Sequence, residues 1–388
     1  MRLAVVTSHP VQYYAPLFRA LAQQLELTVL YGHRAGADDQ AAAGFGVGFA
    51  WDSDLMSGYA SEFLDNRAAK PGLDHFAGID TPAIGQLLRE GMFDAVLLIG
   101  WHKKFLLQAL YAAKRLRLPV LVRGDSHLET PRSLVKQLAK RLVYPVFLRQ
   151  FDAALIVGQR NREYWAHYGY PAARMFASPH CVDNAWFAQR AGTAARAELR
   201  GRLGIASAAP VALFAGKLVA FKHPEHMIEA AALVRARGIA LEVLIAGDGP
   251  LRQAIDRRAA ELAVPLHQLG FCNQSQMPAA YAAADVLVLP SDGRETWGLV
   301  TNEALAAGTQ VLVADSAGCA RDMVAVLGAT AAYPFADTAT LADRIAAQLA
   351  LPSGAALVQK AADSFAIAAA VAGIVTAAEA CAFSCKPR

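Results

Sequence analysis

The sequence has few cysteines, no long apolar run and no strong excess of charge of either sign. Its five cysteines, spread over 388 residues, form neither a CxxC pair nor a zinc-site spacing, which favours free thiols in a reducing compartment. The longest apolar tract, FAIAAAVAGIVTAA at 365–378, is shorter than the about 18 residues that a helix needs to cross a bilayer. The N-terminal MRLAVVTSHPVQYY is typical of a first strand and not of a signal peptide. These features predict a cytoplasmic protein.

The charge of the chain excludes one class of partner and leaves one surface open to two interpretations. A net charge of +4 is too small to indicate a nucleic-acid-binding protein. The cations are clustered in KQLAKRLVYPVFLRQ, residues 136–150, where they alternate with apolar residues. This pattern fits either a helix packed on a core or an interfacial helix. We therefore expect no nucleic-acid partner and keep peripheral contact with the inner membrane face as an alternative.

Short apolar runs alternate with amphipathic stretches along the chain, which is the pattern of parallel strands joined by helices. In the first half the predicted strands are 3–8, 27–32, 95–100, 119–124 and 153–158. In the second half they are 211–216, 241–247, 267–271, 285–291 and 310–315. The sequence thus predicts an α/β protein with two doubly wound, Rossmann-like sheets. Because ligands bind beyond the carboxyl ends of strands in such sheets, two sheets that face each other would enclose a cleft.

A polar, Ala- and Gly-rich segment separates the two series of strands. Residues 188–210 end in a proline and predict a linker that contains a short helix. At this chain length two domains are expected. Their predicted bounds are 1–187 and 211–364, and a C-terminal helix at 365–388 is expected to complete the first domain.

The stretch ETWGLVTNEALAAG, residues 295–308, places two glutamates around a turn where a helix should begin. Glu303 falls on the apolar stripe of that helix, and a buried carboxylate needs a hydrogen-bonding partner in the protein or in a ligand. A helix N-terminus favours phosphate. The turn amides expected to hold phosphate are those of Gly298, Leu299, Val300 and Thr301. With Glu295 and Glu303 accepting bonds from hydroxyl groups, the ligand would be a nucleotide sugar; alternatively, Glu295 is a surface residue and Glu303 an acid favoured by the helix dipole.

Two other strand ends carry residues suited to the same ligand. Lys217 and Lys222 flank a short loop after the predicted strand 211–216. Compact ammonium groups can neutralise a diphosphate leaving group, although exposed lysines are also common on any surface. Gly247 and Gly249, in LIAGDGPL, would let the backbone approach a flat ring closely or would simply form a tight turn.

Taken in order, GKLxxxK, IAGDGP, LGF and LPSxxExxGLVxNEALAAG resemble the donor-binding half of a retaining glycosyltransferase of family 4, which has the GT-B fold. The resemblance spans residues 211–325. It implies that Glu295 contacts donor sugar hydroxyls and that Glu303 contacts the ribose. It also implies that Lys217 and Lys222 meet the diphosphate, with Lys217 replacing a commoner arginine and so losing a bidentate fork. The other expected donor contacts are the turn amides, Gly247, Gly249 and Phe271.

The first half is expected to bind the acceptor. SHPVQYYAPLFRAL, residues 8–21, resembles a subset of the family with SHPxQYxAPLFRAL at this position. Gln12 and Tyr13 suit hydrogen bonding and stacking with a sugar acceptor, and His9 is a candidate contact for the donor phosphate. The alternative is a capped turn packed by tyrosines.

Two more strand-end loops of the first half carry candidate residues. PVLVRGDSHLETPR, residues 119–132, corresponds to the loop where relatives carry a histidine near the transferred sugar. Asp125 and His127 are therefore catalytic candidates. His102, in IGWHKKF, is a candidate acceptor contact. Asp183, in the segment between the predicted domains, is expected to cap or orient the hinge.

Two patterns suggest a metal site, and neither is convincing. Asp52 and Asp54 have the DxD spacing of metal-dependent transferases of another fold, but they follow no clear strand. His223 and His226 are three residues apart at a helix start, and no third ligand follows in the sequence. We expect neither a metal nor a cofactor, because the nucleotide sugar is itself a substrate.

The sequence as a whole predicts a glycosyltransferase that moves a sugar from a nucleoside diphosphate to an acceptor hydroxyl. Retention of configuration is implied by the family resemblance, and the setting expected from it is polysaccharide or glycolipid synthesis. Two alternatives remain: a nucleotide-sugar isomerase or hydrolase on the same fold, and a non-catalytic nucleotide-sugar binding protein. The oligomeric state and the identity of the sugar, the base and the acceptor are not predicted.

Overall fold

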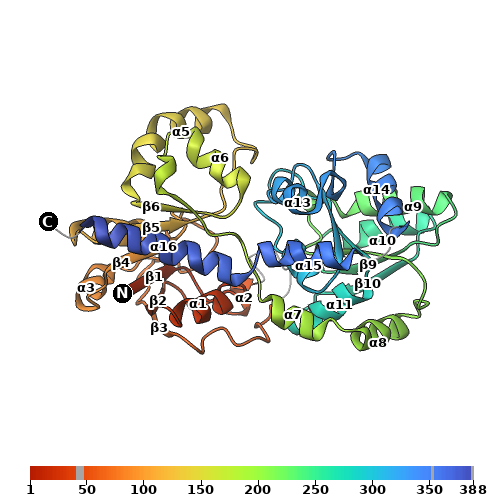
Figure 1. Cartoon of the computed structure of the whole chain (residues 1–388), viewed down its shortest axis with the longest axis horizontal. Helices are drawn as coiled ribbons and strands as arrows, with labels where there is room; N and C mark the ends of the chain where they lie inside the picture. The colour runs from red at the N-terminus through yellow and green to blue at the C-terminus, as the bar shows by residue number, and fades with distance from the viewer. Residues whose placement is uncertain (41–47, 351–353, 386–388) are drawn as a thin grey trace.

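The chain folds into two α/β units, each built on one parallel sheet (Figure 1). The computed structural model describes residues 1–40, 48–350 and 354–385. The N-terminal sheet has the strand order β3-β2-β1-β4-β5-β6-β7. In that order its strands are Ala60–Phe63, Glu26–Tyr31, Arg2–Thr7, Ala95–Ile99, Val120–Arg123, Ala153–Ile156 and Met175–Ala177.

The C-terminal sheet repeats the same winding with one strand fewer. Its order is β10-β9-β8-β11-β12-β13, and the paired strands run parallel. In that order its strands are Leu266–Gly270, Glu242–Ala246, Val211–Ala215, Val286–Leu289, Gln310–Ala314 and Ala332–Tyr333. Both sheets carry apolar clusters on their two faces, so the central strands are buried on both sides.

Helices connect the strands and cover both sheets. In the N-terminal unit they are α1 (Tyr14–Ala22), α2 (Ala37–Gln40), α3 (Ile84–Glu90), α4 (Lys104–Arg115), α5 (Leu134–Phe147) and α6 (Gln159–His167). After the crossover come α7 (Asn184–Arg190), α8 (Thr193–Leu203), α9 (Pro224–Ala236), α10 (Arg252–Glu261), α11 (Met277–Ala283), α12 (Val300–Ala306), α13 (Ala320–Leu327), α14 (Thr338–Ala350), α15 (Ala355–Ser364) and α16 (Ile367–Cys385). Within the described residues, none of the helices is both long and apolar enough to cross a membrane.

All ten predicted strands form, so the expectation of two doubly wound sheets is confirmed. The strand β3 was not predicted, because its sequence ASEF is short and largely polar at the edge of its sheet. The strand β13 was also missed, since two residues carry no periodic signal.

The chain crosses between the units twice. The predicted linker 188–210 contains α8, whose buried Arg200 donates to the carbonyl of Ala283 at 2.9 Å and to the Asp285 carboxylate at 3.1 Å. The helix α16 returns to the N-terminal unit and lies along it (Figure 1). Its buried residues share one apolar cluster with strands β1, β2 and β4.

The strand order determines where a ligand can bind. Each sheet reverses its winding at one point, between β1 and β4 in the first and between β8 and β11 in the second. Loops that leave neighbouring strands in opposite directions open a crevice at such a point. The predicted residues His9, Gln12, Tyr13 and His102 follow β1 and β4, and Lys217, Lys222 and Glu295 follow β8 and β11.

Candidate active site

A cavity of about 380 Å³ lies between the two units at these strand ends. The N-terminal unit contributes Gln12, Tyr13 and Trp51 to its lining. The C-terminal unit contributes, among others, Lys217, Lys222, Gly247, Phe271, Glu295, Gly298, Leu299, Val300 and Glu303. The structure therefore brings most of the predicted donor residues into one cavity.

Two of the predicted charged groups that line this cavity form an ion pair. The Lys222 ammonium contacts the Glu295 carboxylate, and both side chains are mostly buried. The hydroxyl of Ser291 donates to the same carboxylate oxygen at 3.2 Å. Burial lowers the pKa of the nearby Lys217 ammonium, and Lys222 lowers it further. Glu295 therefore holds Lys222 in place, a contact that the sequence pattern did not predict.

Glu303 is a buried acid with a partner inside the protein. The Tyr281 hydroxyl donates to its carboxylate at 2.5 Å. Burial raises the pKa of the Glu303 carboxyl to about 7, against the smaller opposing effect of the Tyr281 hydrogen bond. The sequence indicated that this acid needs a polar partner, and the structure supplies one while still exposing part of Glu303 to the cavity.

The turn before α12 offers fewer amides than expected. The helix begins at Val300, within the stretch 295–308 where the sequence predicts a helix start. The amide of Thr301 donates to the carbonyl of Gly298 at 2.9 Å, and the Thr301 side chain is fully buried. Thr301 is thus a structural residue of the turn and does not line the cavity. The other three predicted residues, Gly298, Leu299 and Val300, do line it.

The glycines of LIAGDGPL serve a close approach between two backbones. A Cβ atom on Gly247 would lie 1.8 Å from the carbonyl oxygen of Gly216, and one on Gly249 would lie 2.6 Å from that of Leu218. Both glycines have positive φ angles, 156° and 155°. The two loops are also joined by a hydrogen bond from the Leu218 amide to the Asp248 carbonyl, 2.9 Å long. Gly247 lines the cavity, whereas Gly249 only permits the loop that carries Lys217 to pack.

Aromatic rings from both units meet at one end of the cavity. The ring of Phe271 lies 4.4 Å, between centroids, from that of Phe49, which in turn contacts Trp51 at 4.8 Å. The Asn273 side chain donates to the carbonyl of Ala50 at 2.8 Å and holds this loop of the N-terminal unit against the other unit. The rings of Phe271 and Trp51 could stack on a planar base.

A second cavity, of about 350 Å³, lies in the N-terminal unit and shares Tyr13 with the first. Its lining includes His9, His102 and Asp125. The structure therefore places His9 in the same cavity as the candidate acceptor residue His102 and not among the residues that line the first cavity.

Gln12 lines the first cavity, where its Oε1 atom is buried and makes no hydrogen bond within the part of the chain that the structure describes.

Burial lowers the pKa values of the three histidines that line the second cavity, His9, His102 and His180. Burial, with a smaller contribution from the nearby His33, lowers the pKa of His9 to about 4. Burial also lowers the pKa of His102, with Lys103 contributing in the same direction. These imidazoles can donate or accept hydrogen bonds, but they cannot supply a positive charge to a phosphate.

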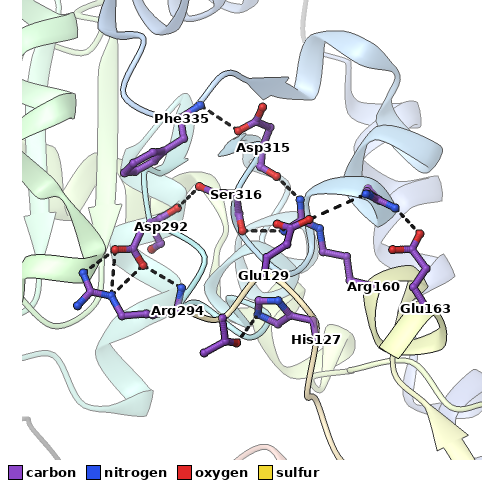
Figure 2. A network of polar contacts seen from close by, with 12 residues as sticks. His127, Glu129, Arg160, Glu163, Asp292, Arg294, Asp315, Ser316 and Phe335 are labelled. Atoms are coloured by element: carbon purple, nitrogen blue, oxygen red, sulfur yellow. Dashed lines mark hydrogen bonds and ion pairs between the residues drawn. The ribbon is translucent and has the colours of Figure 1, made fainter. Parts of the chain in front are cut away.

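The two catalytic candidates of the loop after β5 have different surroundings. Asp125 lines the second cavity and accepts a hydrogen bond of 2.7 Å from the Thr296 hydroxyl, next to Glu295 in the other unit. His127 is fully buried and lines neither cavity. Its Nε2 atom lies 3.5 Å from the Thr130 hydroxyl, and Figure 2 shows His127 near Glu129. We therefore keep Asp125 in the candidate site and leave His127 out.

Sequence reasoning missed three residues that shape the site. Arg123 ends the apolar strand β5, is buried and lines the second cavity. It donates to the carbonyl of Pro179 at 2.9 Å. Asn302 is also buried: it accepts a bond of 2.8 Å from the Trp297 indole and donates at 3.0 Å to the carbonyl of His180 in the other unit. A charged residue at the end of an apolar strand was a usable signal for Arg123, but Asn302 and Trp51 had none.

A polar network joins the two units beside the site (Figure 2). The buried Arg160 of α6 contacts Glu129 in its own unit and the carbonyls of Asp315 and Ser316 in the other, the latter at 2.8 Å. The Asp322 carboxylate of α13 accepts the Gln159 amide at 3.1 Å. These contacts fix the orientation of the units and so the shape of the cavity between them.

The patterns considered for metal have protein partners. Asp52 accepts from the Ser275 amide at 3.2 Å, and Asp54 accepts from the amides of Met56 and Ser57. His223 and His226 do gather a third candidate, Glu225, with ligand atoms within 4.8 Å of one another. One nitrogen of His223 already faces Glu225 at 2.9 Å and the other faces Asp292 at 3.5 Å.

Asp183 caps α7 by accepting the Trp186 amide at 3.0 Å, as predicted.

Two Rossmann-like sheets that face each other across a cavity define the GT-B fold, and comparison with solved structures supports it. The Anabaena protein Alr3699/HepE, solved in complex with UDP and glucose, superposes with a TM-score of 0.70 at 15% identity, over 98% of this chain and 100% of that one. Residues 195–364 match the family described as "Glycosyl transferases group 1". The family match therefore covers the C-terminal unit and the helix α15.

Curated relatives are similar over about a third of the chain. The D-inositol 3-phosphate glycosyltransferase of Nocardia farcinica is 38% identical over 133 residues, which cover 32% of this chain and 29% of that protein. The GDP-mannose-dependent alpha-(1-6)-phosphatidylinositol dimannoside mannosyltransferase of Mycobacterium tuberculosis is 35% identical over 117 residues, 27% of this chain and 30% of that protein. The aligned region thus spans less than a third of each relative.

Proposed function

We propose that this protein is a glycosyltransferase that moves a sugar from a nucleoside diphosphate sugar to an acceptor hydroxyl. The observation that carries the proposal is the cavity between the units, where Lys217, Lys222, Glu295 and Glu303 meet residues of the N-terminal unit. The family match of residues 195–364 and the names of both curated relatives support a transferase. One relative is named for GDP-mannose and one structural neighbour was solved with UDP, so the base is a matter for experiment.

The cavity suggests a division of roles along the donor. Trp51 and Phe271 would contact the base, and Glu303 would accept bonds from the ribose hydroxyls. Lys217 and Lys222 would neutralise the diphosphate. Glu295 would keep Lys222 oriented through the ion pair and use its remaining oxygen lone pairs for sugar hydroxyls.

The reaction that fits these residues is a front-face substitution with retention. The bond from the anomeric carbon to the diphosphate oxygen breaks, and the bond to the acceptor oxygen forms on the same face. The proton of the acceptor hydroxyl passes to an oxygen of the leaving diphosphate. No general base is then required, and the lysine charges stabilise the leaving group in a site that is preorganised for it.

The second cavity is the proposed place of the acceptor. It adjoins the first through Tyr13, and Asp125 reaches across to Thr296 beside Glu295. Its neutral histidines and the carboxylate of Asp125 suit hydrogen bonds with sugar hydroxyls. A relative named for a phosphatidylinositol dimannoside favours glycolipid or polysaccharide synthesis as the setting.

Calorimetry with UDP, GDP and the other nucleoside diphosphates tests the donor site directly. A nucleotide that binds is then offered as its sugar conjugates with a pool of acceptors, and products are read by mass spectrometry. The anomeric coupling in the proton NMR spectrum of the product reports retention or inversion. Conversion of the donor without an acceptor would instead indicate an isomerase or a hydrolase, and binding without any turnover a non-catalytic protein.

The same assay tests the prediction that no metal is needed. We expect transfer to continue in the presence of a strong chelator, because the lysines supply the positive charge at the diphosphate. Loss of activity with the chelator and its recovery with a divalent cation would overturn this expectation. Variants at His223 and His226 would then show whether their cluster is the metal site.

A further inference from the structure

The helix α5 exposes its apolar residues to solvent. Although it has 14 residues, none of them is buried. Its exposed apolar side chains are Leu134, Val135, Leu138, Leu142, Val143 and Val146, each between 57% and 82% exposed. Residues 134, 138, 142 and 146 follow one another at a spacing of four and so form a continuous stripe. Figure 1 shows α5 at the edge of the N-terminal unit.

Lys140 of α5 points toward the protein, although a lysine is expected on the outer face of a surface helix. The Lys140 ammonium donates to the Tyr164 hydroxyl at 3.3 Å and lies 4.6 Å from the centre of the Tyr144 ring. The leucine stripe therefore faces away from the protein. A helix that packs only on its own chain shows the opposite orientation, with the leucines inside and the lysines outside. Among the described residues nothing covers this stripe.

The charges beside the stripe have one sign. Lys136 and Arg141 are exposed on α5, and Arg132 and Arg149 flank it. The helix contains no acidic residue. A groove of about 570 Å³ runs along its flank and is lined in part by Arg132, Lys136 and Lys140.

We propose that α5 docks this protein on the surface of an anionic lipid bilayer. An apolar stripe flanked by cations suits the boundary between acyl chains and acidic headgroups, where the leucines enter the hydrocarbon and the cations meet phosphates. A second copy of the chain is a less suitable occupant, because two α5 helices would bring their cations together. An acidic protein partner could pair with the cations. Its acidic groups, however, would be poor partners for the stripe of branched apolar side chains.

Docking in this way has a consequence for the second cavity. Lys140 and Tyr144 line both that cavity and the groove on the flank of α5. The proposed acceptor site would thus lie directly behind the membrane-facing helix. If the proposed function holds, the acceptor is one that a lipid carries.

Vesicle sedimentation tests the docking without any assay of activity. The full chain is mixed with vesicles of phosphatidylglycerol and phosphatidylcholine, and in parallel with vesicles of phosphatidylcholine alone. We expect the protein to sediment with the anionic vesicles, and raised salt to weaken the binding. Absence from both pellets, or equal binding to both, overturns the proposal.

Two variants locate the contact on α5. In Leu138→Glu/Leu142→Glu, vesicle binding should fall by at least about tenfold, because two exposed leucines that would enter the hydrocarbon are replaced by acids. In Lys136→Gln/Arg141→Gln it should fall by about fivefold for each charge removed. All four residues are exposed, so thermal unfolding of both variants should match the parent protein.

Matched controls sit on the other unit. Leu233→Glu/Leu357→Glu introduces the same two acids at exposed leucines of α9 and α15. Arg257→Gln/Lys360→Gln removes two exposed cations of α10 and α15. Equal losses in a control pair and in its α5 counterpart would show a general charge effect and refute the assignment to α5. Self-association that the α5 leucine variant abolishes, in a protein that ignores vesicles, would assign the stripe to a second copy instead.

Discussion

Glu303 shows how one buried residue links stability, pH and ligand binding. Its carboxyl has a pKa of about 7 in the folded chain, above the ordinary value of 4.5, because burial disfavours the charged form. The folded state therefore binds a proton that the unfolded state has already lost between these two values. The resulting stability is fully present below about pH 4.5 and is lost as the pH rises through about 7.

The first prediction follows from this sign. Between about pH 5 and about pH 8, the unliganded protein should lose on the order of 3 kcal/mol of unfolding free energy through this group. Glu303→Gln, which is always neutral, should show a smaller loss over the same range. Urea denaturation at both pH values measures the difference. An equal loss in the parent and the variant would place the titration elsewhere.

The second prediction concerns the pair of Lys222 and Glu295. Replacing Lys222 with an uncharged residue should lower kcat by a factor on the order of 10² to 10³, because one charge that stabilises the leaving group is lost. Glu295→Ala should have an effect of similar size if the acid orients the lysine. In that case the double variant should lose less transition-state stabilisation, in free energy, than the sum of the two single variants, since the residues act as a unit.

Steady-state kinetics of the four proteins measures this cycle. Arg258→Ala, which removes two partly exposed ion pairs of the C-terminal unit, serves as the control and should leave kcat unchanged. Unchanged transfer in Glu295→Ala would refute its role at the sugar and at Lys222.

At the scale of elements, the loops after β8 and β9 can be as close as they are only because glycines form them. The third prediction is that Gly247→Ala destabilises the protein much more than Gly238→Ala. Both positions have positive φ angles, but a Cβ atom at Gly238 meets open space, whereas one at Gly247 meets the Gly216 carbonyl. The strain at Gly238 should cost about 1–2 kcal/mol, and Gly247→Ala should exceed it.

Thermal unfolding and donor calorimetry together measure this difference. Because the loop after β8 carries Lys217, Gly247→Ala should also weaken nucleotide binding, and Gly238→Ala should not. Similar stability and binding in the two variants would show that the two loops can move apart at little cost in free energy.

The elements also show where sequence patterns lose their predictive value. The buried central strands were predicted because they are apolar and uniform, while the edge strand β3 was missed because solvent on one side removes that signal. The sequence of α5 allowed two interpretations. Which face of that helix points outward depends on where α6 lies, and no local pattern contains that information.

At the scale of the whole molecule, the buried Arg160 joins the two units. The fourth prediction is that Arg160→Met opens the cavity, because the carbonyls of Asp315 and Ser316 lose their donor from the other unit. The cost should be about 2–4 kcal/mol of unfolding free energy. Small-angle X-ray scattering should show a larger radius of gyration, and Arg258→Met, within one unit, should leave it unchanged. A variant as compact as the parent would show that other contacts hold the units together.

The sequence by itself determined the two sheets, the strand ends that carry the candidate residues and most residues that line the cavity between the units. These follow from short-range causes: apolar periodicity, glycines at turns, and charged residues directly after strands. Only the tertiary structure decided that Glu295 holds Lys222 and that His127 lines neither cavity. It also decided that Thr301 makes its hydrogen bond within its own turn and that α5 turns its leucines outward. Each of these depends on a neighbour far away in the chain, and the burial that shifts a pKa or occupies a hydrogen bond exists only when both units are in place.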